Sequence, residues 1–424
     1  MFRRAAAPLR FAHTSGALAL DAAERAAIQA GFADLKRPPV VLQATPSLEA
    51  ADLEPSAIWA AEATALAGGR AIVAGAGGPI DRLKRIGAEF AELPLDSRGP
   101  VGIGRNAGRL RKLIETHNVD IVHARNREIA WAARQATRGL SGKRKVILVT
   151  SVGTDAPFRD AVRDGGSLID GDCIVAGSAH VRDVLAEADP EKRARTAIIP
   201  EGVDFGHFTA NAISSERLTR LARSWGMLEE PSPTIFAPGP LEPLRGQHAL
   251  ARALGGLVGA ADLADVVTII AGDAPSKSNY AEQLAGIARK GRAGRVFLSA
   301  AVADLPAAMM LADIVVSLPM EPLGQDVTAA MAQALGKPVL VANHGASAEV
   351  PLDRETGRIV SPTNPEAIAE AIAELLRLPP EQRDCMADGA RVRARRLFSA
   401  GAAALATTRL YAALMAEAPV ATLR

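Results

Sequence analysis

The chain has 424 residues, of which 48% are hydrophobic, 23% are charged and 4% are aromatic. This balance is typical of globular proteins with aliphatic cores, and the length predicts two or three domains. The formal net charge of +2 is nearly neutral, so it gives no indication of a nucleic-acid partner. Cys173 and Cys385 lie far apart and lack a metal-binding spacing, so we expect two reduced thiols.

The N-terminal segment is basic, with Arg3, Arg4 and Arg10 and no acidic residue before position 21. It lacks the sustained apolar centre of a secretory signal, and no run in the chain is long enough to span a bilayer. A transit peptide or a membrane-contacting segment would have this composition, but a poorly ordered extension is the preferred interpretation. Residues 1–36 are therefore assigned to an N-terminal extension that includes a short helix from residue 21.

Apolar runs alternate with helix-favouring segments along the rest of the chain, a pattern typical of parallel α/β folds. We expect strands at residues 40–43, 71–74, 120–125, 146–150, 173–176, 234–237, 266–272, 296–298, 314–316 and 339–342. We expect helices at residues 57–67, 80–86, 105–117, 307–311, 325–335, 366–378 and 391–414. Asn364 is the expected N-cap of the helix over 366–378, with Pro365 at the first helical position.

The most informative stretch is residues 317–344, SLPMEPLGQDVTAAMAQALGKPVLVANH. A strand delivers Glu321 into a turn that Gly324 closes, and a helix follows that stops at Gly336 and Pro338. A second strand completes a βαβ unit. Glu321 therefore lies at the carboxyl end of a parallel strand, where open α/β sheets bind their ligands.

These residues resemble the signature of the retaining family 4 glycosyltransferases, E-x-F-G-x-x-x-x-E-A-x-A-x-G-x-P-V. The matching positions are Glu321-Pro322-Leu323-Gly324 and residues 331–339, MAQALGKPV. Residues 197–208, AIIPEGVDFGHF, resemble the family's hinge segment, and residues 105–125 resemble a subgroup of its bacterial members. The resemblance covers residues 38–415 and implies a GT-B fold, in which two Rossmann-like domains face each other across a cleft.

The resemblance also implies the domain boundaries. Residues 37–205 would form the acceptor domain and residues 206–395 the nucleotide-sugar donor domain. Residues 396–424 would form a helix that crosses back to the first domain.

The site residues follow from the same resemblance. Glu321 would bind hydroxyls of the donor sugar, and Asp155 and His123, at strand ends of the first domain, are further catalytic candidates. Arg245 would neutralise the donor diphosphate in place of the family's lysine. The remaining expected donor-binding residues are Gly239, Gly246, Gly272, Leu323, Gly324 and Gln325. No metal and no cofactor is expected.

Four positions depart from the family pattern. Ala329 or Met331 stands in place of the second glutamate, Val152 in place of a histidine, and Pro240 in place of an arginine; the turn at 44–54 has no glycine. These departures motivate a second hypothesis, a binding or scaffold protein that keeps the fold without catalysis. An epimerase with this fold is a third hypothesis, which no residue specifically supports.

The leading hypothesis is a metal-independent, retaining glycosyltransferase that moves a sugar from a nucleotide-sugar donor to a lipid-linked or cell-envelope glycan. We expect a cytoplasmic protein of bacterial type. Basic residues of the first domain suggest peripheral contact with the inner face of the membrane. These residues are Arg105, Arg109, Arg111, Lys112, Lys143, Arg144 and Lys145.

Overall fold

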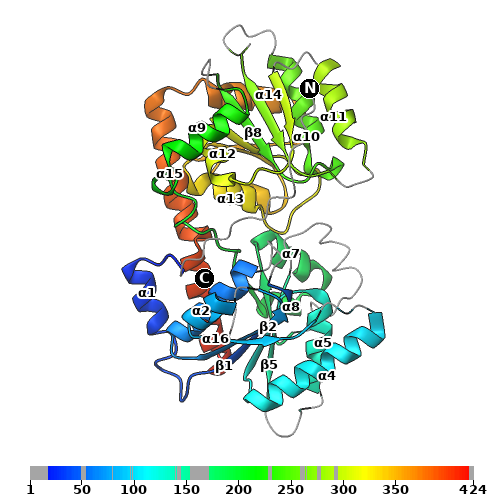
Figure 1. Cartoon of the computed structure of the whole chain (residues 1–424), viewed down its shortest axis with the longest axis vertical. Coiled ribbons are helices and arrows are strands. Elements are labelled where there is room, and N and C mark those ends of the chain that lie inside the picture. Colours follow the sequence, from blue (N-terminus) through cyan, green and yellow to red (C-terminus); the bar gives the residue numbers. More distant parts are fainter. Residues whose placement is uncertain are drawn as a thin grey trace. The chain divides into compact units, whose positions relative to one another are not determined.

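The computed structural model describes residues 18–48, 54–78, 80–95, 97, 99–138, 140, 145–152, 171–227, 232–257, 263, 265–274, 278–290 and 295–419 (Figure 1). The described chain forms two compact units. The first domain contains residues 18–204 and 397–419, and the second domain contains residues 205–396. Each is an α/β domain built on one parallel sheet, which confirms the predicted pair of Rossmann-like domains.

The first domain contains a sheet of seven described strands in the order β3-β2-β1-β4-β5-β6-β7, all parallel. The strands are β1 (Val40–Ser47), β2 (Arg70–Ala76), β3 (Glu89–Glu92), β4 (Ile121–Ala124), β5 (Ile147–Ser151), β6 (Cys173–Ala176) and β7 (Thr196–Ile198). The order reverses between β1 and β4, which makes this the switch point of the sheet.

Helices cover both faces of this sheet. They are α1 (Ala22–Gln29), α2 (Glu54–Leu66), α3 (Ile80–Arg85), α4 (Gly99–His117), α5 (Arg127–Arg138), α7 (Ala179–Ala188), α8 (Glu191–Ala194) and α16 (Ala400–Met415). Successive strand residues point to opposite faces. Leu42 and Val122 accordingly join the core under α4 and α5, whereas Val41 and Ile121 join the core under α2 and α16.

The N-terminal helix α1 packs into the first-domain core that lies under α2 and α16. A capping box of Asp21 and Glu24 begins the helix, as expected for this pair of residue types. Leu18, Ile28 and Phe32 are buried with the core under α2 and α16. The described part of the segment that we had assigned to an extension therefore packs into the first domain.

The second domain repeats the same strand order, β10-β9-β8-β11-β12-β13, and all its described strands are parallel. The strands are β8 (Thr234–Pro238), β9 (Val267–Ala271), β10 (Arg295–Ser299), β11 (Ile314–Ser317), β12 (Val339–Ala342) and β13 (Gly357–Val360). The helices are α9 (Ser215–Ser224), α10 (Gln247–Ala253), α11 (Tyr280–Lys290), α12 (Leu305–Leu311), α13 (Val327–Ala334), α14 (Pro365–Leu376) and α15 (Pro380–Phe398). Short 3-10 turns are η2 (Ala210–Ala212), η3 (Pro243–Arg245), η4 (Leu254–Leu257) and η6 (Gly345–Glu349).

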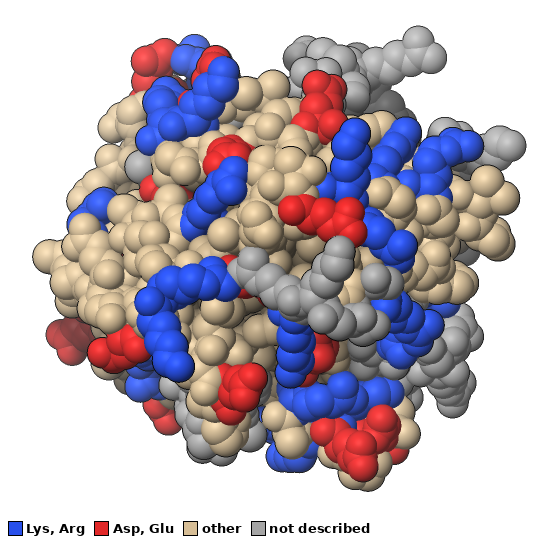
Figure 2. Space-filling view, turned by 90° about the horizontal axis from the view of Figure 1, so that it is seen from below, with Lys and Arg blue, Asp and Glu red and all other residues tan. Residues whose placement is uncertain are grey.

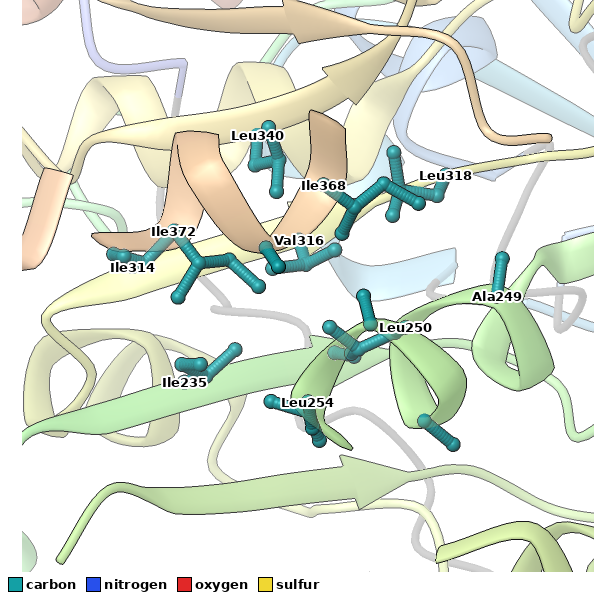
Figure 3. Packing of buried hydrophobic residues seen from close by; sticks show 14 of the residues in the cluster. Ile235, Ala249, Leu250, Leu254, Ile314, Val316, Leu318, Leu340, Ile368 and Ile372 are labelled. Atoms are coloured by element: carbon teal, nitrogen blue, oxygen red, sulfur yellow. The ribbon is translucent and has the colours of Figure 1, made fainter. Parts of the chain in front are cut away.

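The main core of the second domain is aliphatic (Figure 3). Leu250 and Leu254, from α10 and the turn after it, pack with Ile368 and Ile372 of α14 over the strands. The strand residues beneath them are Ile235, Ile314, Val316 and Leu340. Full burial of one such side chain stabilises a fold by about 1.5–3 kcal/mol, so this layer holds the strand ends in place.

The predicted C-terminal helix over 391–414 is wrong as a single element. It consists of α15 and α16, which are separated at Ser399, where the backbone is extended and the hydroxyl caps α16 through Ala402 N–H. The break lets Val203 pair with Ser399, because Val203 N–H donates to Phe398 O and Ala400 N–H donates to Val203 O. The chain then continues as α16, which packs on α1 and α2 in the first domain, as the fold predicted.

Other predicted elements are present with small shifts at their ends. The strand expected at 40–43 continues to Ser47, with an irregular register between Ala44 and Ser47. Asn364 caps α14 by accepting from Ala367 N–H, and Pro365 is the first helical residue, both as predicted. Within the described residues, no helix is both long enough and apolar enough to cross a membrane.

Candidate functional site

The candidate donor site lies at the carboxyl edge of the second sheet, where β8 and β11 are neighbours and the strand order reverses. Ligands of open α/β sheets bind at the carboxyl ends of the strands at such a switch point. The turn after β8 contains Gly239, Arg245 and Gly246, and the turn after β11 contains Glu321. The predicted donor-binding residues therefore share one edge of one domain.

Backbone contacts hold these turns together. Gly239 N–H donates to Ala271 O at 2.9 Å, and a Cβ on Gly272 would lie 1.7 Å from Gly239 O. The turn after β9 thus touches the turn after β8 at a position where a side chain cannot be accommodated. This close approach of two main chains requires a glycine at position 272, whereas Gly239 is favoured by its own φ of 137°.

A second close approach joins the turns after β8 and β11. Gly246 has φ 74°, and a Cβ there would lie 1.7 Å from Leu318 O. Met320 N–H also donates to Leu244 O at 2.8 Å. Since Arg245 and Glu321 directly follow these two bonded residues, the two predicted charged groups are brought to adjacent backbone positions.

The side chains of Arg245 and Glu321 remain available. Arg245 is half-buried and Glu321 is exposed. Among the described residues, neither side chain has a hydrogen-bond or ion-pair partner. A cation and a carboxylate therefore extend from neighbouring backbone positions with their hydrogen-bonding capacity free for a ligand.

The other predicted residues of this turn have mainly packed surroundings. Leu323 is buried, and Leu323 O accepts from Ala346 N–H at 3.0 Å. A Cβ on Gly345 would lie 2.8 Å from Leu323 N, so the loop after β12 is packed directly on the residue before Gly324. Gln325 is also buried. These contacts fix the course of the main chain around Glu321.

Asp326 is a central residue of this edge that our sequence reasoning missed. Its buried carboxylate caps α13 through Ala329 N–H at 3.0 Å and accepts from the Ser347 hydroxyl at 2.8 Å. Burial raises the pKa of Asp326, whereas hydrogen bonds from Ala329, Ser317 and Ser347 and the charge of Arg245 lower it. An aspartate before a helix-favouring run is a recognisable N-cap signal. The hydrogen bond that Asp326 accepts from Ser347 could not be predicted from the sequence.

Neither of the two residues that stand in place of the second family glutamate offers a polar side chain. Ala329 is buried in the first turn of α13, and Met331 lies two residues further on and is half-buried. The helix itself keeps its position between β11 and β12. The substitution therefore removes a hydrogen-bond acceptor from the site without removing the element that carried it.

The first domain holds a buried polar network at the switch point between β1 and β4. His123 is 1% exposed and Tyr411, on α16, is fully buried. The His123 ring contacts Tyr411 Oη through Nδ1 at 2.6 Å and Ser151 Oγ through Nε2 at 2.7 Å. Both ring nitrogens are thus occupied by protein groups, which favours a positioning role for His123 over the predicted catalytic one.

Burial has large electrostatic effects in this network. It lowers the pKa of His123 well below the ordinary value, and the charge of Arg125 acts in the same direction. Burial also raises the pKa of Tyr411 to about 12. Arg125 Nε and Nη2 donate to Gln43 Oε1 at 3.0 and 2.7 Å. His123 is therefore neutral at physiological pH and lies beside a buried cation.

Asp155, the third catalytic candidate, lies outside the described residues. The predicted basic surface is described only in part, because Lys143 and Arg144 also lie outside. Within it, Arg109 donates to Pro94 O at 2.7 Å, and Arg111 donates to the carbonyls of Gln135 and Ala136. Figure 2, which looks onto the molecule from below, shows basic and acidic side chains intermixed. These arginines act at least partly as structural ties.

Two family models match the chain. The model described as glycosyl transferases group 1 matches residues 232–378, and the model described as Glycosyltransferase Family 4 matches residues 60–207. The two matches fall in the second and first domains respectively.

Named relatives agree with these models. The chain is 30% identical over 285 residues to the GDP-mannose-dependent alpha-(1-6)-phosphatidylinositol monomannoside mannosyltransferase of Mycobacterium tuberculosis, covering 63% of this chain and 69% of that protein. It is 30% identical over 220 residues to the D-inositol 3-phosphate glycosyltransferase of Corynebacterium urealyticum, covering 51% and 50% of the two chains.

Solved structures show the same fold. A glycosyltransferase from Rickettsia africae superposes with a TM-score of 0.76 at 23% identity, covering 90% of this chain and 99% of that one. An Anabaena HepE structure in complex with UDP and glucose gives 0.68 at 20% identity, covering 89% and 99%. With both family models and a relative at 30% identity in agreement, the chain belongs to the family 4 glycosyltransferases of the GT-B fold.

Proposed function

We propose that this glycosyltransferase takes its sugar from a nucleoside diphosphate hexose and transfers it, with retention, to a lipid-linked or cell-envelope glycan. The observation that carries the donor assignment is that the Arg245 guanidinium and the Glu321 carboxylate have no partner among the described residues and stand on two turns joined by the Met320–Leu244 hydrogen bond. A diphosphate brings two negative charges, and a sugar brings hydroxyls that donate to a carboxylate. The pair therefore matches the two halves of such a donor.

Arg245 would bind the diphosphate through charge-assisted hydrogen bonds with the planar fork of its guanidinium. Asp326 supports this role by placing a buried carboxyl within electrostatic range of the guanidinium without an ion pair that would occupy it. Glu321 would accept hydrogen bonds from donor-sugar hydroxyls. Because a side-chain cation is present, we propose that the leaving diphosphate is stabilised without an obligatory metal ion.

The acceptor proposal is supported by what the relatives are named for. A phosphatidylinositol mannoside is the acceptor in the names of the mycobacterial proteins, and inositol phosphate in that of the corynebacterial one. We propose a glycolipid or cell-envelope glycan for this chain, reached at the cytoplasmic face of a membrane. Arg105 and Lys112 on the exposed side of α4 would contribute to that contact.

Calorimetric titration with UDP and GDP, and with UDP-glucose and GDP-mannose, tests the donor. Arg245→Gln should weaken binding of the preferred diphosphate roughly 10- to 150-fold, the equivalent of about 1.5–3 kcal/mol for charged hydrogen bonds. Arg252→Gln is the matched control, because Arg252 is an exposed arginine of α10, away from the strand ends. Folded wild-type protein that binds none of these nucleotides would contradict the proposal and favour a scaffold function.

Product analysis and metal removal test the chemistry. Transfer should continue in excess EDTA, and the anomeric configuration of the product should match that of the donor. Liposome co-sedimentation tests the membrane contact. Arg105→Glu with Lys112→Glu should reduce binding to anionic vesicles, and unchanged binding would contradict that part of the proposal.

A further inference from the structure

The buried network of the first domain has a fixed hydrogen-bond direction, which begins at Arg125. A guanidinium can only donate, so the Gln43 atom that it contacts at 2.7 and 3.0 Å must be the amide oxygen. The amide nitrogen of Gln43 therefore faces Tyr411 and donates to its hydroxyl oxygen at 2.8 Å. The orientation of the Gln43 amide follows from the chemistry of its neighbours.

The direction passes through Tyr411 to His123. Tyr411 Oη accepts from Gln43, and its own proton has one acceptor within reach among the described residues, His123 Nδ1 at 2.6 Å. If Nδ1 carried a proton instead, the proton of a fully buried phenol would have no acceptor, which costs about 1–3 kcal/mol. Tyr411 therefore donates to Nδ1. A neutral His123 then carries its proton on Nε2.

Nε2–H points at Ser151 Oγ, 2.7 Å away. The serine oxygen therefore accepts from the histidine, the reverse of a Ser–His pair in which histidine removes the serine proton. Ser151 ends β5 and is partly exposed. No described residue accepts its hydroxyl proton. A hydroxyl whose oxygen already accepts a hydrogen bond is polarised as a donor, because hydrogen bonds in a chain strengthen one another.

We propose that Ser151 is a substrate-binding residue of this enzyme, whose hydroxyl donates a hydrogen bond to an oxygen of the sugar or polyol ring of the acceptor. The assignment rests on the proposed function and on the expectation from the family resemblance that the first domain is the acceptor domain. Ser151 lies at the carboxyl edge of the sheet, two strands from β1, where ligands of this fold enter.

Gln43, Tyr411 and His123 are positioning residues in this scheme. They act through Ser151 and do not touch the substrate. The hydrogen-bond network joins β1, β4, β5 and the C-terminal helix α16, so the donor direction of Ser151 depends on Tyr411, which lies 288 positions after His123 in the sequence.

The tautomer of His123 tests the direction of the hydrogen bonds in this network without any measurement of activity. In full-length protein labelled with 15N-histidine, long-range 1H–15N correlation should show a neutral ring with the proton on Nε2 at pH 7. Tyr411→Phe should remove this preference. A proton on Nδ1, or a cationic ring at pH 7, would overturn the assigned direction.

Kinetics test the role of Ser151. Ser151→Ala should raise KM for the acceptor roughly 3- to 10-fold, as expected for one lost hydrogen bond, with KM for the nucleotide sugar within twofold. Ser151→Thr keeps the hydroxyl and should restore KM toward the wild-type value, which a purely structural role would not predict. An unchanged acceptor KM in folded Ser151→Ala, or an increase confined to the donor, would overturn the proposal.

The proposed function and the role of Ser151 can be refuted separately. A wild-type enzyme that transfers no sugar to any glycan or glycolipid would overturn the proposed function and, with it, the acceptor role of Ser151. The tautomer assigned to His123 would still be tested independently by NMR. An active wild-type enzyme with an indifferent Ser151→Ala variant would overturn the serine assignment alone.

Discussion

Replacing Tyr411 by phenylalanine should destabilise the first domain far more than the removal of one exposed oxygen would. The hydroxyl is fully buried, accepts from Gln43 Nε2 at 2.8 Å and contacts His123 Nδ1 at 2.6 Å. Its removal leaves two buried polar groups unsatisfied. Each costs about 1–3 kcal/mol, so the expected loss is about 3 kcal/mol once part of the network relaxes.

Tyr280→Phe is the matched control, because it makes the same chemical change in the second domain. The Tyr280 hydroxyl lies 3.4 Å from His248 Nδ1, beyond the range of a good hydrogen bond, and its other contact is with the backbone of His248, so the expected loss is about 1 kcal/mol. Hydrogen exchange followed by mass spectrometry separates the two domains. Peptides from β4, β5 and α16 should exchange roughly 150-fold faster in Tyr411→Phe, the equivalent of about 3 kcal/mol. Equal, small effects of the two substitutions would refute the reasoning, because they would mean that the buried network contributes no net stability.

Two further predictions concern the turns and the pH dependence of stability. Gly246→Ala should destabilise the second domain more than Gly226→Ala in thermal unfolding, because both have positive φ but only a Cβ at 246 would meet Leu318 O, at 1.7 Å; equal losses would show that the turn yields freely. The lowered pKa of His123 means that the native state binds its proton less readily than the unfolded state, whose value is 6.5. The free energy of unfolding that neutral His123 contributes is complete above pH 6.5. It is lost as pH falls through the native pKa, at up to about 1.4 kcal/mol per pH unit. Urea unfolding from pH 7.5 to 5.0 should show this loss in the wild type and a smaller one in His123→Gln, and identical slopes would contradict the assignment.

The fold was predictable because its signals are local. The apolar run at β12 and the Asn364–Pro365 start of α14 are read from neighbouring residues, and both match the structure. The exposed, partly polar β3 gave no apolar run, so it was missed. The break at Ser399 was missed although Ser399 is a local N-cap, and the pairing with the backbone of Val203 that accompanies the break is too distant in sequence to predict.

The candidate site residues likewise differ in whether a local sequence pattern indicates them. Gly239, Gly246 and Glu321 could be placed at one edge of the second sheet because each belongs to a short motif that follows a strand. The links between Gln43, His123 and Tyr411 join residues 368 and 288 positions apart, and no local pattern encodes such a contact. Tyr411 in particular lies within an alanine-rich helix, where the sequence suggests an ordinary core residue.

The two domains use the same strand order but stabilise their switch points by different means. In the second domain the turns contact one another mainly through main-chain atoms, at Gly239, Gly246 and Gly272. Such a frame tolerates the loss of individual side chains, so Pro240 and Met331 can replace family residues while the turns keep their course. In the first domain the equivalent edge is held by a chain of side chains that ends at Ser151, beside the Val152 that replaces the family's histidine. Departures from the family pattern therefore remove individual side chains in the second domain while its main-chain frame remains, whereas in the first domain the substituted position lies next to Ser151, where the buried polar network ends.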